Sequence, residues 1–166
     1  MKFSKIYPLV TGLLLISQSA FAATDLVACD LFDEPTVSSF IGAKIKQHHV
    51  NRQKETYAGA TSSTCIFFYD RYTIRVYLYE YASSPEAAKV YADGVQSKPI
   101  PGETRTTESG LGDKAFWYRI DMEQFGYTVL KGNRLVAVKM DFKDRNTGAG
   151  VKERSRPMMQ AAVRKI

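Results

Sequence analysis

Hydrophobic and polar residues alternate most regularly in the segment FFYDRYTIRVYLYEYA, which runs from Phe67 to Ala82. An alternation with a period of two is typical of strands that bury one face. With Asp70 and Arg71 as the turn, the segment predicts a β-hairpin in which Phe67 faces Ile74 and Cys65 faces Val76. The predicted core side carries Cys65, Phe67, Tyr69, Ile74, Val76 and Leu78, and the other side carries Ile66, Phe68, Thr73, Arg75, Tyr77, Tyr79 and Tyr81.

Similar patterns predict the remaining strands. The segment YTVLKGNRLVAVKMDF, residues 127–142, predicts a second hairpin, because its Gly-Asn pair suits the tight turns that join antiparallel strands. One side of this hairpin carries Tyr127, Val129, Val136, Val138, Met140 and Phe142, and the other side carries Thr128, Leu130, Leu135, Ala137, Lys139 and Asp141. The segment KAFWYRID, residues 114–121, predicts the strand before it. A further strand is expected around Ala43 to Val50, followed by a flexible link rich in glycine, alanine, serine and threonine.

Three segments predict amphipathic helices. Asp33 can cap the first, which continues to Gly42. The second opens at Ser83-Ser84-Pro85-Glu86, where a serine cap, an early proline and an acidic first turn favour a helix start. The third lies in the C-terminal segment, where Pro157 is expected to start or kink it.

The order of these elements predicts the fold class. Helix, strands, helix, strands and helix follow one another, and the pattern of strand, hairpin and helix occurs twice. We expect an α+β fold with an antiparallel sheet built from two strand–hairpin–helix halves and with the helices packed on one face. The exposed part of the other face would then be the place for a functional site.

The N-terminus predicts export. Lys2 and Lys5 precede the apolar stretch IYPLVTGLLLIS, and AFA at Ala20 to Ala22 offers the small residues that a signal peptidase reads. We expect a signal peptide over residues 1–22, cleavage after Ala22, and one periplasmic domain over residues 23–166. Cleavage removes two lysines and no acidic residue, so the net charge of +6 falls by two to +4.

Three alternatives exist for the two cysteines, Cys29 and Cys65. In an exported protein an even count favours a disulfide, and two free buried thiols are the alternative. The segment LVAC, Leu26 to Cys29, also resembles a lipobox, which would place a lipid on Cys29. Polar residues separate LVAC from the apolar stretch, so a lipoprotein is the less favoured prediction.

Three motifs together carry a resemblance: CDLFDEPTVSSFIG, STCIFFY and GLGDKAFW, the last at Gly110 to Trp117. The chain resembles small exported bacterial proteins and lipoproteins of unknown function that share these features. The resemblance implies that the two cysteines pair and that the Gly-Leu-Gly-Asp segment leads into the second half of the sheet. It brings no catalytic residues, and this chain lacks the well-placed lipobox of the lipoprotein members.

Motifs for catalysis and for metal binding are missing from the sequence. His48 and His49 are the only histidines, and adjacent residues on a strand point to opposite faces, so they are poorly placed to share a metal. No G-x-S-x-G motif occurs, and Asp121 and Glu123 lie beside a turn where we expect them to be exposed. We therefore predict neither an enzyme nor a bound metal or cofactor.

The tyrosine-rich side of the first hairpin is the candidate binding surface. Tyrosine and arginine are common anchors of protein interfaces, so we expect Arg75, Tyr77 and Tyr79 to contact a protein partner in the cell envelope, with Trp117 and Arg119 extending the surface. If a helix or the other half of the sheet covers this side, the tyrosines are core residues instead.

The expected role is therefore that of a binding protein: an inhibitor, an immunity factor or an envelope accessory. A carrier of a small aromatic or amphiphilic ligand is the alternative, and a hydrolase with an unrecognised site is the third. The excess of basic over acidic residues would allow weak contact with anionic surfaces, whereas export argues against nucleic acid as a partner.

Overall fold

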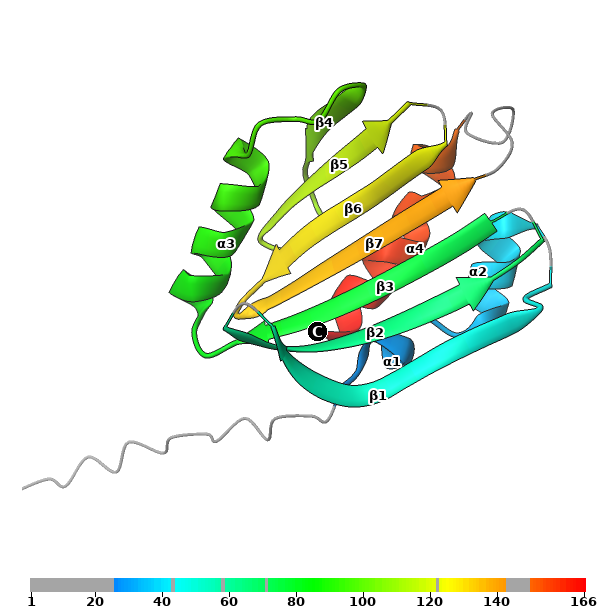
Figure 1. The fold of residues 1–166 in the computed structure, drawn as a ribbon, viewed down its shortest axis with the longest axis horizontal. Coiled ribbons are helices and arrows are strands. Elements are labelled where there is room, and N and C mark those ends of the chain that lie inside the picture. The colour runs from blue at the N-terminus through cyan, green and yellow to red at the C-terminus, as the bar shows by residue number, and fades with distance from the viewer. Residues whose placement is uncertain (1–25, 43, 58, 71, 122, 143–149) are drawn as a thin grey trace, which may run out of the picture.

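The computed structural model describes residues 26–42, 44–57, 59–70, 72–121, 123–142 and 150–166, and for residues 48–57 the backbone alone. The expected signal peptide and its cleavage site lie outside the described residues. Seven antiparallel strands form one open sheet in the order β1-β2-β3-β7-β6-β5-β4 (Figure 1). The strands are β1 Gln47–Tyr57, β2 Ala60–Phe68, β3 Tyr72–Tyr81, β4 Glu103–Glu108, β5 Lys114–Ile120, β6 Gln124–Lys131 and β7 Arg134–Phe142.

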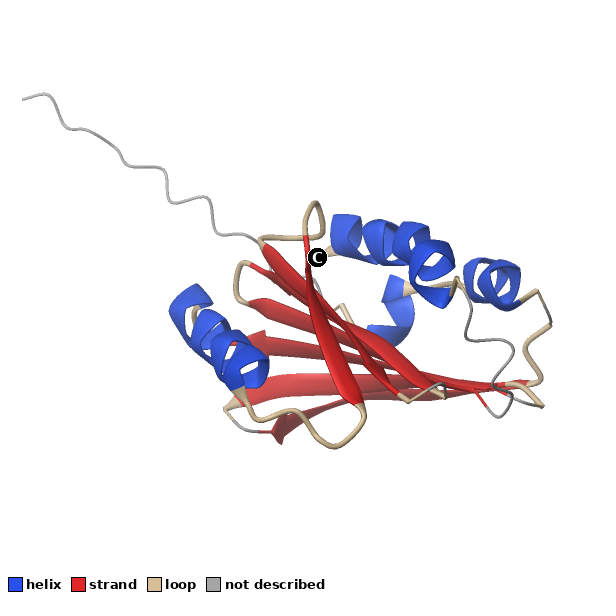
Figure 2. Cartoon of the chain, turned by 90° about the horizontal axis from the view of Figure 1, so that it is seen from above, coloured by secondary structure: helices blue, strands red, loops and turns tan. Residues whose placement is uncertain are grey.

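Four helices lie on the two faces of this sheet. Helices α1 (Ala28–Leu31), α2 (Glu34–Ile41) and α4 (Val151–Lys165) cover one face, which we call the inner face. Helix α3 (Ser84–Gln96) packs on the opposite, outer face (Figure 2). The α+β class and the antiparallel sheet are confirmed. The expectation that all helices share one face is wrong for α3, because β3, β6 and β7 also present apolar residues outward at the end where α3 crosses.

The hairpin registers follow the sequence pattern. Cys65 pairs with Val76 and Phe67 with Ile74 across β2 and β3, as predicted. The second hairpin turns at Gly132-Asn133, between β6 and β7. The predicted inward side chains of both hairpins are buried in the main core, against α1, α2 and α4. Strands β3 and β7 pair with each other, so they join the two halves at the centre of the sheet.

Residues close in the sequence determine where the helices begin and end. The Asp33 carboxylate accepts a hydrogen bond of 2.7 Å from the backbone N–H of Thr36, and Gly42 ends α2 with a φ of 74°. The Ser83 hydroxyl caps α3 in the same way, accepting from the N–H of Glu86 at 3.4 Å. Pro157 lies inside α4, so that helix begins earlier than the sequence suggested.

The disulfide between Cys29 and Cys65 is present. It joins α1 to the middle of β2, with 5.0 Å between the two Cα atoms. The backbone N–H of Ala28 also donates to the Ser63 hydroxyl at 2.9 Å, so two links fix this short helix on the inner face. The prediction of a bonded pair is confirmed, and the alternative of two free thiols is wrong.

The edge strands differ from the sequence prediction. Strand β1 begins at Gln47 and continues to Tyr57, and β2 starts at Ala60, where a flexible link was expected. Strand β4 was not predicted, because its sequence ETRTTE contains no hydrophobic residue. Its backbone pairs with β5 along its whole length, and this pairing depends on tertiary structure that a local pattern does not record. Within the described residues, no helix has the length and apolar character needed to cross a membrane.

Candidate binding site on the outer sheet face

The outer face brings together only part of the predicted site. Arg75, Tyr77 and Tyr79 follow one another along β3 on this face, all partly buried. The rings of Tyr77 and Tyr79 stack, with 6.3 Å between their centroids and 15° between their planes. The tyrosine side of the hairpin therefore does form one continuous aromatic surface on the face opposite the main core.

Trp117 and Arg119 lie on the inner face, so they do not extend the tyrosine surface. Trp117 is buried in the main core, where its ring lies 5.9 Å from that of Phe125 and 4.7 Å from that of Tyr127. Arg119 shares the inner orientation and is exposed near the end of β5. The segment KAFWYRID is aromatic on both faces, so its pattern does not reveal which residues point outward.

Phe116 and Tyr118 are the aromatic β5 residues on the outer face, and the sequence pattern did not identify them as site residues. Tyr118 lies over Gly126 of β6, whose missing side chain gives the ring its place: a Cβ there would stand 2.4 Å from the Tyr118 ring. Burial and the nearby Asp141 carboxylate raise the pKa of Tyr118 well above its usual value. Its hydroxyl therefore stays protonated at physiological pH.

An apolar pocket of about 260 Å³ lies between α3 and the outer face. Its floor is made of small or short side chains, Thr128 and Ala137, between the aromatic residues of β3 and those of β5. The complete lining is Tyr79, Tyr81, Val90, Tyr91, Gly94, Phe116, Thr128, Leu135 and Ala137. The pocket is half open to solvent, and it adjoins Tyr77 through the stacked Tyr79 ring.

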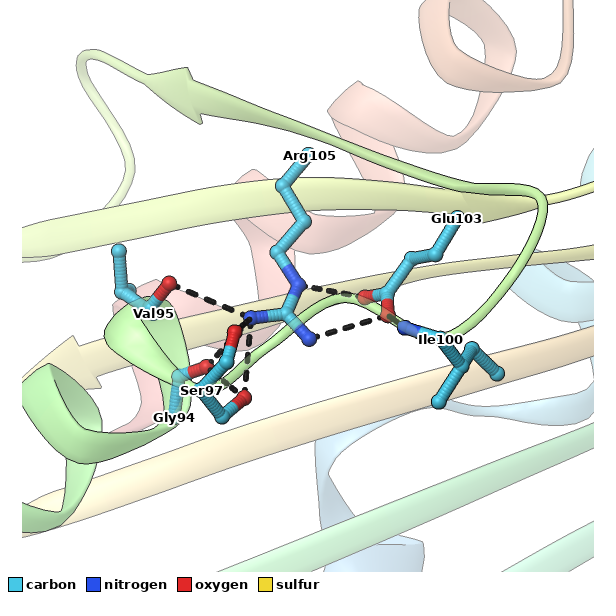
Figure 3. A network of polar contacts seen from close by, with 6 residues as sticks. All are labelled: Gly94, Val95, Ser97, Ile100, Glu103 and Arg105. Carbon is cyan, nitrogen blue, oxygen red and sulfur yellow. Dashed lines mark hydrogen bonds and ion pairs between the residues drawn. The ribbon is translucent and has the colours of Figure 1, made fainter.

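Arg105 of β4 holds the C-terminal end of α3 over this pocket (Figure 3). Its Nη1 donates to the carbonyl oxygens of Gly94, Val95 and Ser97 at 2.7, 3.2 and 3.0 Å. These are carbonyls that a helix end leaves without an intrahelical partner, so a cation there is favourable. The Arg105 guanidinium also lies 6.0 Å from the centroid of the Phe116 ring in the pocket wall.

Glu103 completes this network. Its carboxylate pairs with Arg105 at 2.5 Å and accepts the backbone N–H of Ile100 at 3.0 Å, which closes the loop between α3 and β4. The hydrogen bond from Arg105 is the main reason why the pKa of Glu103 lies below its usual value of 4.5. The two residues share one side of β4, separated by one residue, and this spacing makes the pair possible.

A charged cluster borders the pocket on the side of Tyr77. Arg75 and Asp141 form an ion pair across β3 and β7, and Lys139 Nζ lies 3.6 Å from the same carboxylate. Two cations therefore share one anion. Among the described residues, no group of three or more histidine, cysteine or acidic residues could hold a metal ion. The side chains of His48 and His49 lie outside the described part, and Asp121 and Glu123 are exposed as predicted.

A second hollow, of about 610 Å³, lies on the helical side of the molecule. It separates α2 from α4 and is lined by Pro35, Thr36, Ser39, Phe40, Arg154, Pro157 and Met158. None of the residues that the sequence analysis singled out for binding reaches it. The outer pocket is the better candidate because it combines an apolar interior, four aromatic residues in its lining and a charged border.

Comparison with known proteins is informative about the fold. The structure is similar to the crystal structure of the extracellular domain of PknH from Mycobacterium tuberculosis, with a TM-score of 0.53 and 12% sequence identity. The similarity covers 84% of this chain and 95% of that chain. No family model matches the sequence, and no curated protein matches it.

Proposed function

We propose that this chain is an exported, non-catalytic binding protein that engages another protein of the cell envelope through its outer sheet face. An inhibitor, an immunity factor or an envelope accessory would each use such a face. The observation that carries the proposal is the half-open apolar pocket between α3 and the aromatic surface of β3. A partner would insert one apolar or aromatic side chain there, since interface anchors occupy well-packed pockets surrounded by weaker contacts.

The size of the pocket favours an anchor side chain over a whole small ligand. Pockets that enclose drug-sized ligands span about 300–1,000 Å³ and bury most of the ligand surface. The pocket under α3 measures about 260 Å³ and is half open, so it would leave much of such a ligand in solvent. Carriage of a small aromatic or amphiphilic ligand remains the second candidate, supported by the four aromatic residues in the pocket wall.

Three features support export. The N-terminal segment has the sequence features of a signal peptide with a cleavage site after Ala22. The chain carries a disulfide between Cys29 and Cys65, and such bonds persist in oxidising compartments. The structurally similar domain of PknH is named as extracellular. A periplasmic location and a free, unlipidated Cys29 belong to this proposal.

A pocket-filling substitution tests the function. Ala137→Leu should occupy the pocket floor. Thr104→Leu, which adds apolar bulk at an exposed position of β4 on the opposite face of the sheet, is the control. A photo-crosslinking residue in place of Tyr79 should yield a discrete adduct with an envelope protein in cells. We expect Ala137→Leu to abolish the adduct and Thr104→Leu to retain it. An adduct that survives Ala137→Leu would contradict a pocket-anchored partner.

A further inference from the structure

The described side chains on the strands of the outer face carry more positive than negative charge. On the described side chains of β2 to β7, four cations and two carboxylates point outward: Arg75, Arg105, Lys114 and Lys139, with Glu103 and Asp141. Glu103 is occupied by Arg105 and by a backbone N–H, inside the network that holds α3. Asp141 is the one carboxylate near Arg75 and Lys139 on these strands, and it compensates only one of their two charges. The cluster therefore has a net charge of about +1 at neutral pH.

The cluster of Arg75, Lys139 and Asp141 lies beside the pocket, further along strands β3 and β7. Ala137, in the pocket floor, and Lys139 are two residues apart on β7, so they share the outer face. Arg75 pairs with Lys139 across β3 and β7, just as Tyr77 pairs with Ala137. Two residues along a strand span roughly 7 Å, which sets the distance between the pocket floor and the two cations.

An extended peptide has the same repeat. Its side chains at positions i and i+2 point to one side and are also roughly 7 Å apart. In a bound segment that runs along β7, a side chain in the pocket therefore places the side chain two residues away over Arg75 and Lys139. The neighbouring Tyr118 hydroxyl adds no negative charge there, because a phenol is neutral at physiological pH and burial raises the pKa of Tyr118 further.

We infer that the outer face recognises an extended segment of the partner with an apolar or aromatic residue and an acidic residue two positions apart. The inference rests on the proposed function and names the chemistry of the partner at the same site. The pocket under α3 takes the apolar side chain, and the cluster of Arg75 and Lys139 takes the carboxylate. Charge complementarity, rather than pocket shape, selects the acidic residue.

The test uses three acetylated and amidated peptides with the cores Phe-Ser-Glu, Phe-Ser-Gln and Phe-Glu-Ser. Each is titrated into the oxidised domain, residues 23–166, and binding is followed by amide chemical-shift changes at Tyr79, Leu135 and Ala137. The Phe-Ser-Glu peptide should bind about two- to fivefold tighter than either control, the gain expected for a partly exposed ion pair. Adding salt should reduce this gain.

Two protein variants test which lysine causes the preference for the glutamate peptide. Lys139→Gln should remove most of the preference for glutamate, whereas Lys114→Gln, a cation elsewhere on the same face, should leave it unchanged. Equal binding of all three peptides in the pocket would overturn the acidic recognition and leave the proposed function standing. Absence of shifts at the pocket for every peptide would overturn both. A dimer that Ala137→Leu dissociates, seen by analytical ultracentrifugation, would make a second copy the occupant and overturn the inference.

Discussion

Replacing Arg105 by alanine should release the end of α3 from β4. The guanidinium donates to three backbone carbonyls at the helix end and pairs with Glu103, so one substitution removes every contact of the network in Figure 3 except the hydrogen bond between Ile100 and Glu103. The side chain of Glu103 is only 7% exposed, and it would keep a single partner, the N–H of Ile100. Much of the loss of stability then comes from the Glu103 carboxylate, which stays buried without its cation.

The size of the effect follows from that burial. Removing one partner of a buried ion pair typically costs about 3–5 kcal/mol, and the remaining hydrogen bond to Ile100 favours the lower end, about 3 kcal/mol. For a domain of this size each kcal/mol lowers the melting temperature by roughly 2–4 °C, so we expect a fall of about 6–12 °C. The pocket would also lose the wall that α3 forms, because the helix is no longer held at its C-terminal end.

Urea unfolding of three variants checks this reasoning. Arg105→Ala should be destabilised by about 3 kcal/mol, and the double variant Arg105→Ala with Glu103→Ala should recover part of that loss, because no unpaired carboxylate remains. Lys114→Ala, the removal of an exposed cation on the same face, should change stability by less than about 0.5 kcal/mol. The reasoning is refuted if Arg105→Ala costs no more than Lys114→Ala, or if the double variant is less stable than Arg105→Ala.

Three further predictions concern other parts of the molecule. Replacing Cys29 and Cys65 by alanine should lower the free energy of unfolding by about 2–5 kcal/mol, measured in denaturant, since the bond closes a loop of about 37 residues. Replacing Tyr77 and Tyr79 by serine should cost about 1–2 kcal/mol in a thermal melt, between the values for surface and core changes, because both rings are partly buried. Because its pKa is lowered in the folded state, Glu103 contributes stability above its unfolded pKa near 4.5 and loses it as the pH falls through the folded pKa. Urea titrations at about pH 6 and pH 3 should therefore show a smaller acid-induced loss in Arg105→Ala than in the parent protein.

Local sequence signals were sufficient to locate both hairpins and two of the helices. Alternation and turn residues fixed both hairpins, so the pairing of Cys65 with Val76 could be stated in advance. Capping residues located α2 and α3, because Asp33 and Ser83 bond to backbone groups only three residues away. The disulfide was foreseen from cysteine count and from resemblance, and the structure confirmed it.

Tertiary structure decided which face each helix covers. Leu130 and Leu135 lie on the side of the second hairpin that the pattern left outward, and α3 buries them together with Tyr81. A strand with apolar residues on both sides does not say which side faces which helix, since period-two alternation is then lost. For the same reason Trp117 could not be placed from KAFWYRID, and it lies in the main core.

The sequence predicted one part of the candidate site, and only the tertiary structure revealed the rest. The sequence identified Arg75, Tyr77 and Tyr79, because their own strand has a clear alternation. The pocket, the contact of Arg105 with the end of α3 and the cluster with Lys139 combine these β3 residues with α3 and with residues of β4 to β7, which lie further along the chain. Pairing between distant strands depends on the packing of the whole sheet, and the local order of polar and apolar residues contains no record of it.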